Sequence, residues 1–146
     1  MIPETYDFMR WLRRSVPQTV QLLAEVHHEP GKQRELLESG GVDWVYDFSL
    51  PLLILHALYT GSNHNVLHWL RIRPNRMITT LDTHDGIGVV DVEGLMTHAE
   101  IDITSAWVKQ NGGVEALRAN GKNSDTLDVY QLNSTYYSAV GEDDDA

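Results

Sequence analysis

The sequence predicts an α/β fold built on parallel strands. Three short segments are nearly continuous runs of apolar, aromatic and β-branched residues, which is typical of strands that are buried on both faces. Helical segments alternate with these runs along the chain, as they do where neighbouring strands are parallel. The 146 residues are 42% hydrophobic and 22% charged, an ordinary composition for one domain with a real core. The pattern fits a barrel and an open doubly wound sheet equally well.

The first part of the chain supplies a helix, a strand and a second helix. A helix is predicted over 3–16, because apolar side chains recur there every three residues and Pro17 ends the pattern. The apolar run 19–27 predicts a strand buried on both faces. A loop and a short polar helix follow, and we expect that helix to end at Gly40.

The middle of the chain repeats this alternation. Aromatic and β-branched residues predict strands over 42–50 and 76–82. Between them, 51–61 and 63–72 are predicted to be two helices, the first closed by Gly61.

The last third is less regular. A helix within 96–113 is predicted to begin at a capping box formed by Thr97 and Glu100. A polar stretch over 117–126 follows. The segment 127–140 mixes aromatic and β-branched residues in a way that fits a strand and a helix equally.

Charge and composition exclude several classes of function. The formal net charge of −10 repels phosphate backbones, so no nucleic-acid partner is expected. The absence of cysteine excludes disulfides and thiolate chemistry. No run of 18 apolar residues and no secretory signal is visible, so we expect a cytoplasmic protein without a membrane partner.

Acids and histidines follow all three predicted strands. Because the carboxyl ends of parallel strands share one face, these side chains are expected to gather there, as an active site or as a polar rim. The set is Glu25 and His27, then Asp47, then Asp82, His84 and Asp85. We expect Asp82 to point away from His84, and Asp43 and Asp47 are candidates for structural roles.

The other histidines favour structural interpretations. His28 is expected to begin a solvated loop, and His56, on an apolar helix face, is expected to be hydrogen-bonded in the core. The helical positions of His64, His68 and His98 indicate no function.

The motifs that are absent from the sequence exclude most classes of catalytic or cofactor-binding site. His27, His28 and Glu29, together with 82–85, offer imidazoles and carboxylates for zinc or a dinuclear centre, but in no compact metal signature such as HExxH. No GxSxG, GxGxxG or GxxxxGK[ST] motif occurs. Carboxylate chemistry of the glycosidase kind remains, and Glu25 would serve as its acid if partial desolvation raised its pKa.

Four stretches of the sequence are distinctive as a set: LLAEVHHE, VYDFSLPLLILHALYTG, TTLDTHDGIGVVDV and LDVYQLNSTYYSAVG. In this order they resemble the sucrose phosphorylases, a group of (β/α)8-barrel enzymes in the α-amylase superfamily, glycoside hydrolase family 13. The resemblance begins near residue 20 and covers nearly all of the remaining chain. The most specific stretch is TTLDTHDGIGVVDV, over 79–92.

The resemblance implies a partial TIM barrel. By this similarity the chain holds about strands five to seven of the barrel with their helices, plus the segment inserted after strand seven. Residues 1–85 would be part of the catalytic barrel, and 86–146 would be the insertion and the start of the return to the barrel.

The resemblance also implies roles for seven residues. Glu25 matches the general acid/base, and Asp85 matches the acid that stabilises the transition state. His84 would hydrogen-bond the same sugar, and His27 would face the acceptor subsite. The stretch DVYQ resembles a mobile loop that contacts sugar and phosphate in turn, which makes Asp128, Tyr130 and Gln131 candidates for substrate binding.

The implied reaction is transfer of a glucosyl group from sucrose or a related glucoside to inorganic phosphate by double displacement with retention. It requires no cofactor and no metal, and a homodimer would be unsurprising for a full-length enzyme. A hydrolase or transglucosylase of the same superfamily is the alternative.

The RxDA motif that carries the nucleophilic aspartate in the family does not occur in this sequence. We therefore expect the isolated chain to be inactive, and a catalytically incomplete remnant is a further alternative. The stretch EVHHEPGKQ differs from the EIHEHY typical of sucrose phosphorylases, which leaves the leaving group open among fructose, fructose 6-phosphate, glycerol and glycerate.

Overall fold

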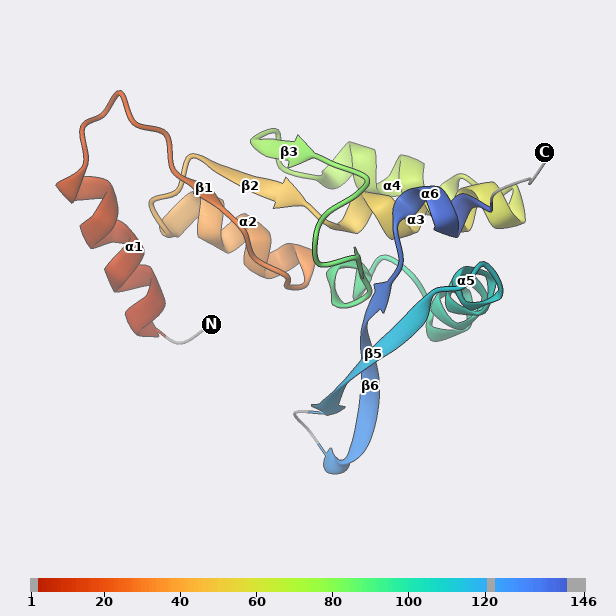
Figure 1. Cartoon of the computed structure of the whole chain (residues 1–146). Helices are drawn as coiled ribbons and strands as arrows, with labels where there is room; N and C mark the ends of the chain where they lie inside the picture. Colours follow the sequence, from red (N-terminus) through yellow and green to blue (C-terminus); the bar gives the residue numbers. More distant parts are fainter. Residues whose placement is uncertain (1–2, 121–122, 142–146) are drawn as a thin grey trace.

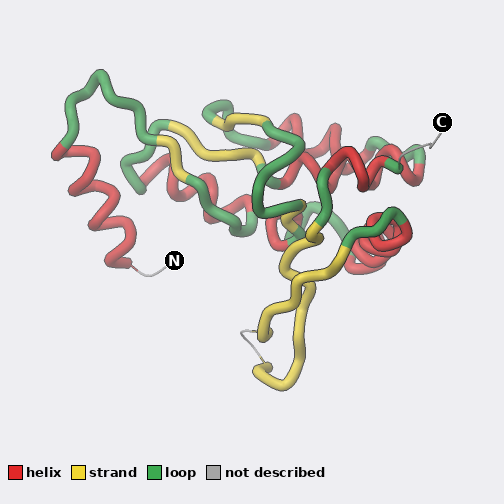
Figure 2. The backbone as a smooth tube through the Cα atoms, in the orientation of Figure 1, coloured by secondary structure: helices red, strands yellow, loops and turns green. Residues whose placement is uncertain are grey.

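The computed structural model describes residues 3–120 and 123–141, and it contains two small sheets with helices around them (Figure 1). One sheet is parallel, with strand order β1-β2-β3, and the other is antiparallel, with strand order β4-β6-β5. Figure 2 shows the strands in these two groups, with the helices placed mostly around the first. The mixed α/β class predicted from the sequence is confirmed.

The parallel sheet consists of β1 (Leu23–Ala24), β2 (Trp44–Asp47) and β3 (Met77–Thr79). Ala24 is aligned with Val45, and Val45 is aligned in turn with Met77. Consecutive strands are therefore neighbours, and their carboxyl ends lie at one edge of the sheet.

All three strands are shorter than the runs 19–27, 42–50 and 76–82 from which they were predicted. The prediction that the first strand is buried on both faces is wrong, because Leu23 is 41% exposed. The physical reason is its position: among the described residues β1 pairs only with β2, so it forms an edge of the sheet.

The helices predicted in the first half are confirmed as α1 (Pro3–Ser15), α2 (Pro30–Ser39), α3 (Ser49–Thr60) and α4 (His64–Ile72). Gly61 ends α3 in the left-handed conformation, with a φ of 73°, and its N–H bonds to the carbonyl of Ala57. Residues other than glycine rarely adopt a φ of this value, which explains why the helix ends at a glycine.

The core is built around α3. This helix contacts α4, α5, α6 and β4, and it carries three leucines that are fully buried, Leu52, Leu53 and Leu55. Trp69 of α4 is also fully buried, and its Nε1 donates to Asp47 at the end of β2 over 2.9 Å. Figure 1 shows α3 and α4 together, beyond the carboxyl ends of the parallel strands.

The rest of the chain forms β4 (Ile87–Gly88), a short 3₁₀ helix η1 (Val90–Val92), and four further elements. These are α5 (His98–Gln110), β5 (Val114–Asn120), β6 (Asn123–Asn133) and α6 (Tyr136–Val140). The β5–β6 hairpin projects from the body of the molecule in Figure 1. No described helix is long and apolar enough to cross a membrane.

The structure tests three sequence patterns in this half of the chain. The capping box at Thr97 and Glu100 is confirmed: the Thr97 N–H donates to Glu100 Oε2 over 2.7 Å, and the Glu100 N–H donates to Thr97 Oγ1 over 3.3 Å. The polar stretch 117–126, apart from residues 121 and 122, which lie outside the described residues, belongs to β5 and β6. The segment 127–140 is strand in its first half and helix in its second.

Asp47 and Asp43 have the structural roles considered for them. Asp47 is fully buried, accepts from the Leu50 N–H and from Trp69, and pairs with Arg73 at 2.6 Å. Asp43 accepts from the Leu22 N–H and pairs with Arg13 at 2.8 Å. Asp47 is therefore directed into the core and does not join the acids at the sheet edge.

Replacing Asp47 with Ala should lower the free energy of unfolding by about 3–5 kcal/mol, because it leaves the Trp69 donor and the Arg73 charge without their partner. Urea unfolding followed by tryptophan fluorescence measures the change. The exposed pair of Asp7 with Arg10 supplies the control, since Asp7→Ala should leave the free energy of unfolding nearly unchanged. Equal effects of the two substitutions would contradict the structural role of Asp47.

Candidate active site

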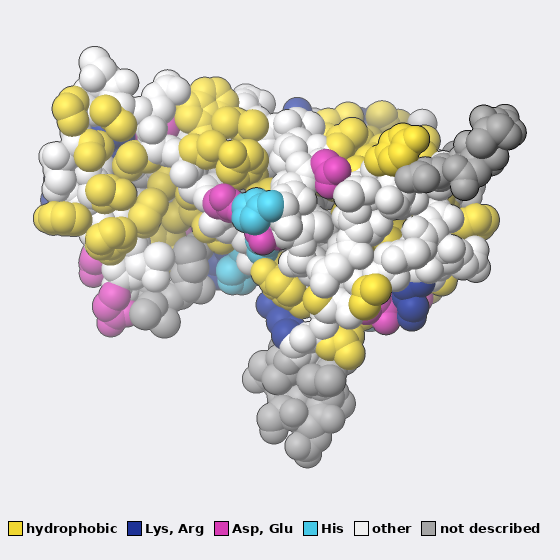
Figure 3. Space-filling model, viewed as in Figure 1, with side chains coloured by type: hydrophobic (Ala, Val, Ile, Leu, Met, Phe, Trp, Pro, Cys, Tyr) yellow, Lys and Arg dark blue, Asp and Glu magenta, His cyan; other side chains and the backbone are white. Residues whose placement is uncertain are grey.

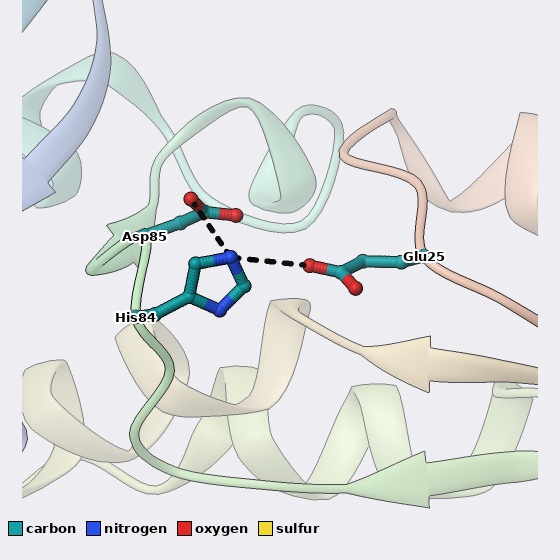
Figure 4. A group of neighbouring side chains, drawn as sticks. All are labelled: Glu25, His84 and Asp85. Atoms are coloured by element: carbon teal, nitrogen blue, oxygen red, sulfur yellow. Dashed lines mark ion pairs between the residues drawn. The ribbon is translucent and has the colours of Figure 1, made fainter.

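Glu25, His84 and Asp85 meet at the carboxyl edge of the parallel sheet (Figure 4). Glu25 directly follows β1, and the other two residues lie in the turn after β3. Nε2 of His84 lies 3.4 Å from Asp85 Oδ1 and 4.0 Å from Glu25 Oε1, so the imidazole stands between the two carboxylates. The expectation that residues from different strand ends gather at one place is met for these three.

A pocket of about 180 Å³ adjoins this group. Tyr46 and Phe48, from the end of β2, form one wall, and their rings stack with centroids 5.3 Å apart. The remaining lining residues come from the ends of β1 and β3: Glu25, Thr80, Asp82, Thr83 and His84. Asp82 and His84 therefore line the same pocket, and the prediction that they point apart is wrong. Side chains two positions apart share a face of an extended segment, so a strand continued past Thr79 would not have separated them either.

The group lies at the surface. The side chains of Glu25, Asp85 and His84 are 48%, 41% and 78% exposed. Figure 3 shows histidine and acidic side chains grouped near the middle of the face in view. Glu25, which follows an edge strand, is thus about half covered by the protein.

His27 is the buried member of the site, with a side chain only 11% exposed. Its ring stacks on Phe48, with centroids 4.1 Å apart and an angle of 11° between the planes. Nε2 lies 3.8 Å from Asp85 Oδ2, and Nδ1 lies 2.8 Å from Oδ2 of Asp91. His27 therefore links the acid of the surface group to a carboxylate inside the molecule.

Asp91 is fully buried in η1 and binds four groups from three other parts of the chain. Its carboxylate accepts from His27, from the His28 N–H over 3.0 Å and from Gln33 Nε2 over 3.2 Å. Its backbone carbonyl accepts from Ser49 Oγ over 2.6 Å. This residue holds the segment after β1 against the start of α3.

Strand β6 brings two of its three candidate residues to the site. Tyr130 lies edge-on to His27, with ring centroids 6.3 Å apart, and its carbonyl accepts from the Val89 N–H. Gln131 is aligned with Gly88 of β4. Asp128 lies further along β6, opposite Arg118, with an exposed side chain. The loop expected for DVYQ is a strand in the structure.

The spacing of Glu25, His84 and Asp85 is not by itself evidence for a metal site. One possible ligand atom from each lies within 4.8 Å of the others, which a cation could bridge, but the side chains are largely exposed and exposed acids commonly approach this closely without an ion. His28 and Glu29, which belonged to the metal hypothesis, pair with each other.

Three residues of the site were not identified from the sequence. Tyr46 and Phe48 alternate in WVYDFS, so the period-two pattern of a strand places them on one face and could have indicated a wall. Asp91 stands between valines in GVVDVEG. A single acid inside an apolar run is a signal of a buried, hydrogen-bonded carboxylate.

His56 takes no part in the site, as expected. It is 4% exposed, and its Nδ1 lies 3.1 Å from Thr104 Oγ1 in the core between α3 and α5.

Among the groups around His27, Asp91 contributes most to raising its pKa. Burial lowers the pKa of His27, but the hydrogen bond and charge of Asp91, with the charges of Asp85 and Glu25, raise it above the ordinary value overall. A raised pKa in the folded state means that the charged pair stabilises the fold below pH ~6.5, and that this contribution is lost as the pH rises through the higher folded pKa.

Replacing Asp91 with Asn should therefore lower the pKa of His27, because burial then acts without the main opposing charge. An NMR titration of the imidazole measures this pKa. Urea unfolding should show the wild-type advantage over the variant shrinking from pH 6 to pH 9. Asp102→Asn, at an exposed position on α5, is the control for loss of one negative charge. An unchanged pKa in the Asp91 variant would contradict the assignment.

Known proteins are similar to nearly the whole length of this chain. The sucrose phosphorylase of Bifidobacterium adolescentis is 43% identical over 154 aligned positions, which cover 99% of this chain and 30% of that protein. The sucrose phosphorylase of Agrobacterium vitis is 40% identical over 153 positions, with 99% and 31% covered. No protein-family model matches the sequence.

A solved structure agrees with these relatives. The crystal structure of sucrose 6F-phosphate phosphorylase from Thermoanaerobacter thermosaccharolyticum matches with a TM-score of 0.86 and 36% identity, covering 96% of this chain and 29% of that one. The chain spans about three tenths of the length of the relatives it matches. It therefore belongs to the sucrose phosphorylase group of glycoside hydrolase family 13, as a segment corresponding to part of those enzymes.

Proposed function

We propose that this chain forms part of the active site of a retaining glucoside phosphorylase, which transfers a glucosyl group from sucrose or a related glucoside to inorganic phosphate. The observation that carries the proposal is the meeting of Glu25, His84 and Asp85 beside one pocket, with an atom of each within 4.8 Å of the others. Two carboxylates so placed can supply the general acid of glycosidic cleavage and the negative charge that stabilises its transition state.

Glu25 is the general acid/base of this proposal. Its carboxyl protonates the oxygen of the leaving group as the glycosidic bond breaks, and the resulting carboxylate later takes a proton from the incoming phosphate. The position fits this exchange, because the side chain borders the pocket and is half exposed to solvent, where leaving group and acceptor must pass.

Asp85 and His84 hold the glucosyl ring. The Asp85 carboxylate accepts hydrogen bonds from sugar hydroxyls and stabilises the positive charge that develops at the anomeric carbon. His84, 3.4 Å from Asp85 and on the rim of the same pocket, bonds the same ring.

The neighbouring side chains complete the substrate surface. His27 faces the acceptor from the buried side of Asp85. Tyr130, on β6, packs against the ring of His27. Gln131 and Asp128, on the same strand, are assigned to sugar and phosphate binding by the resemblance.

The nucleophile comes from outside these 146 residues. The sequence has no RxDA motif, and the relatives are about three times as long as the chain. We assign residues 1–85 to strands five to seven of a (β/α)8 barrel and 86–146 to the insertion after strand seven. The three sequential parallel strands and the change to an antiparallel sheet at β4 support this division.

The isolated chain should release no glucose 1-phosphate from sucrose and phosphate, because it lacks the nucleophile. A chimera with this chain in place of the matching segment of the Bifidobacterium adolescentis sucrose phosphorylase should regain phosphorolysis. A coupled assay for glucose 1-phosphate measures both. Activity of the isolated chain would contradict the proposal, and so would a folded chimera without activity on any glucoside of the group.

In the active chimera, Glu25→Gln should reduce kcat by about 10²–10⁴-fold, the usual contribution of a general acid. The matched control is Glu38→Gln, at an exposed position on α2, which should leave kcat unchanged. Equal rates for Glu25→Gln and wild type would rule out the acid/base role.

The acceptor separates phosphorolysis from the alternative of hydrolysis or transglucosylation. Omitting phosphate from the assay of the chimera should suppress cleavage of sucrose, because phosphate is the preferred acceptor. Release of glucose at the same rate without phosphate would favour the hydrolase.

A further inference from the structure

We infer that Asp91 is a positioning residue of the active site: it fixes the orientation of His27 and the location of its proton, so that Nε2 is presented to the substrate. This inference rests on the proposed function only for what the substrate is. The positioning itself rests on the contacts of Asp91 and His27.

The Asp91 carboxylate leaves His27 one arrangement of hydrogen bonds. Asp91 Oδ1 accepts two N–H donors, from His28 and Gln33, and Oδ2 lies 2.8 Å from Nδ1 of His27. An ionised carboxylate only accepts, so Nδ1 must carry the proton that it donates. In the neutral ring Nε2 then has a free lone pair, and in the charged ring it has an N–H to donate.

Aromatic rings prevent His27 from turning away. Phe48 covers one face of the imidazole at 4.1 Å, and Tyr130 closes on its edge at 6.3 Å between centroids. The guanidinium carbon of Arg118 lies 5.3 Å from the Tyr130 ring centroid, which fixes that ring in turn. Rotation of His27 would break the stacking on Phe48 and the bond to Asp91 together.

Nε2 of His27 is one of five buried side-chain polar atoms that have no hydrogen-bond partner among the residues that the structure describes. The carboxylate of Asp85 lies 3.8 Å from it, too far for a hydrogen bond. A buried polar atom without a partner costs free energy. This one belongs to a ring that stacks on Phe48, which lines the pocket, so it indicates a group that arrives with the substrate. A sugar hydroxyl satisfies the neutral ring, and a phosphate oxygen satisfies the charged one.

Gly88 makes room for this arrangement. A Cβ at residue 88 would lie 2.0 Å from Asp91 Oδ2 and 3.2 Å from His27 Nδ1. Any other residue at this position would place its Cβ against the carboxylate of Asp91 where it meets the imidazole. The glycine at this position in DGIGVVD thus has a steric reason connected with the site.

The direct test is the tautomer of His27 in the full 146-residue chain, read from long-range ¹H–¹⁵N correlations at a pH where the ring is neutral. The inference predicts a protonated Nδ1 and an unprotonated Nε2 in the wild type. A protonated Nε2 with a bare Nδ1 would overturn it, and this result requires no variant.

An isosteric variant sharpens the test. In Asp91→Asn the side-chain oxygen can still accept from His28, while the amide NH₂ replaces Oδ2 and can only donate to Nδ1. The tautomer should therefore invert, with the proton on Nε2. Asp102→Asn, exposed on α5, should leave the wild-type tautomer in place. A His27 tautomer that is the same in wild type and Asp91→Asn would contradict the positioning role.

The consequence for turnover is tested in the chimera. Asp91→Asn should lower kcat/KM for phosphate by about 10–100-fold, the effect seen when an imidazole at a metal site loses its orienting partner. An unchanged kcat/KM in a folded variant would show that the orientation of His27 is without catalytic importance. Because the tautomer is measured in the chain itself, it tests the positioning even if the chimera proves to be a hydrolase.

Discussion

The buried carboxylate of Asp91 is the contact on which the arrangement of the site depends. It binds the segment after β1 through His27 and His28, α2 through Gln33, and the first residue of α3 through its own carbonyl. Burying a carboxylate is costly unless its oxygens are satisfied, and here donors from separate segments of the chain must be in place together to satisfy it. The same contact thereby holds the segment that follows β1 against η1, which directly follows β4 of the antiparallel sheet.

The acids near the site fall into two sets with different roles, one structural and one facing the substrate. Asp47 and Asp91 are fully buried and hold the framework, whereas Glu25 and Asp85 stand at the solvent edge of the parallel sheet, where a substrate can reach them. His27 joins the two groups, with one nitrogen on Asp91 and the other toward Asp85. The site thus has a rigid buried side and an open side.

Sequence patterns predicted the parts of this structure that local physics determines. The capping box of Thr97 and Glu100, the glycine end of α3 at Gly61 and the gathering of Glu25 with His84 and Asp85 at strand ends all follow from neighbours in sequence or from the geometry of parallel strands. The length and burial of β1 do not, because they depend on which strands lie on either side of it.

Contacts between distant segments account for the other differences. The polar residues of the β5–β6 hairpin form strands because they pair with each other, and Asp91 reaches residues more than 50 positions away. Its surroundings in the sequence show that it is buried but not what it binds. The prediction that Asp82 points away from His84 was wrong, because side chains two positions apart lie on the same face of an extended segment.

A crystal structure of the chimera with bound sucrose tests the central claim most directly. The account predicts the glycosidic oxygen within about 2.6–3.2 Å of the Glu25 carboxyl, and the glucosyl hydroxyls bonded to Asp85 and His84. Sucrose bound with its glycosidic oxygen away from Glu25, and with no contact between the glucosyl ring and Asp85, would contradict it.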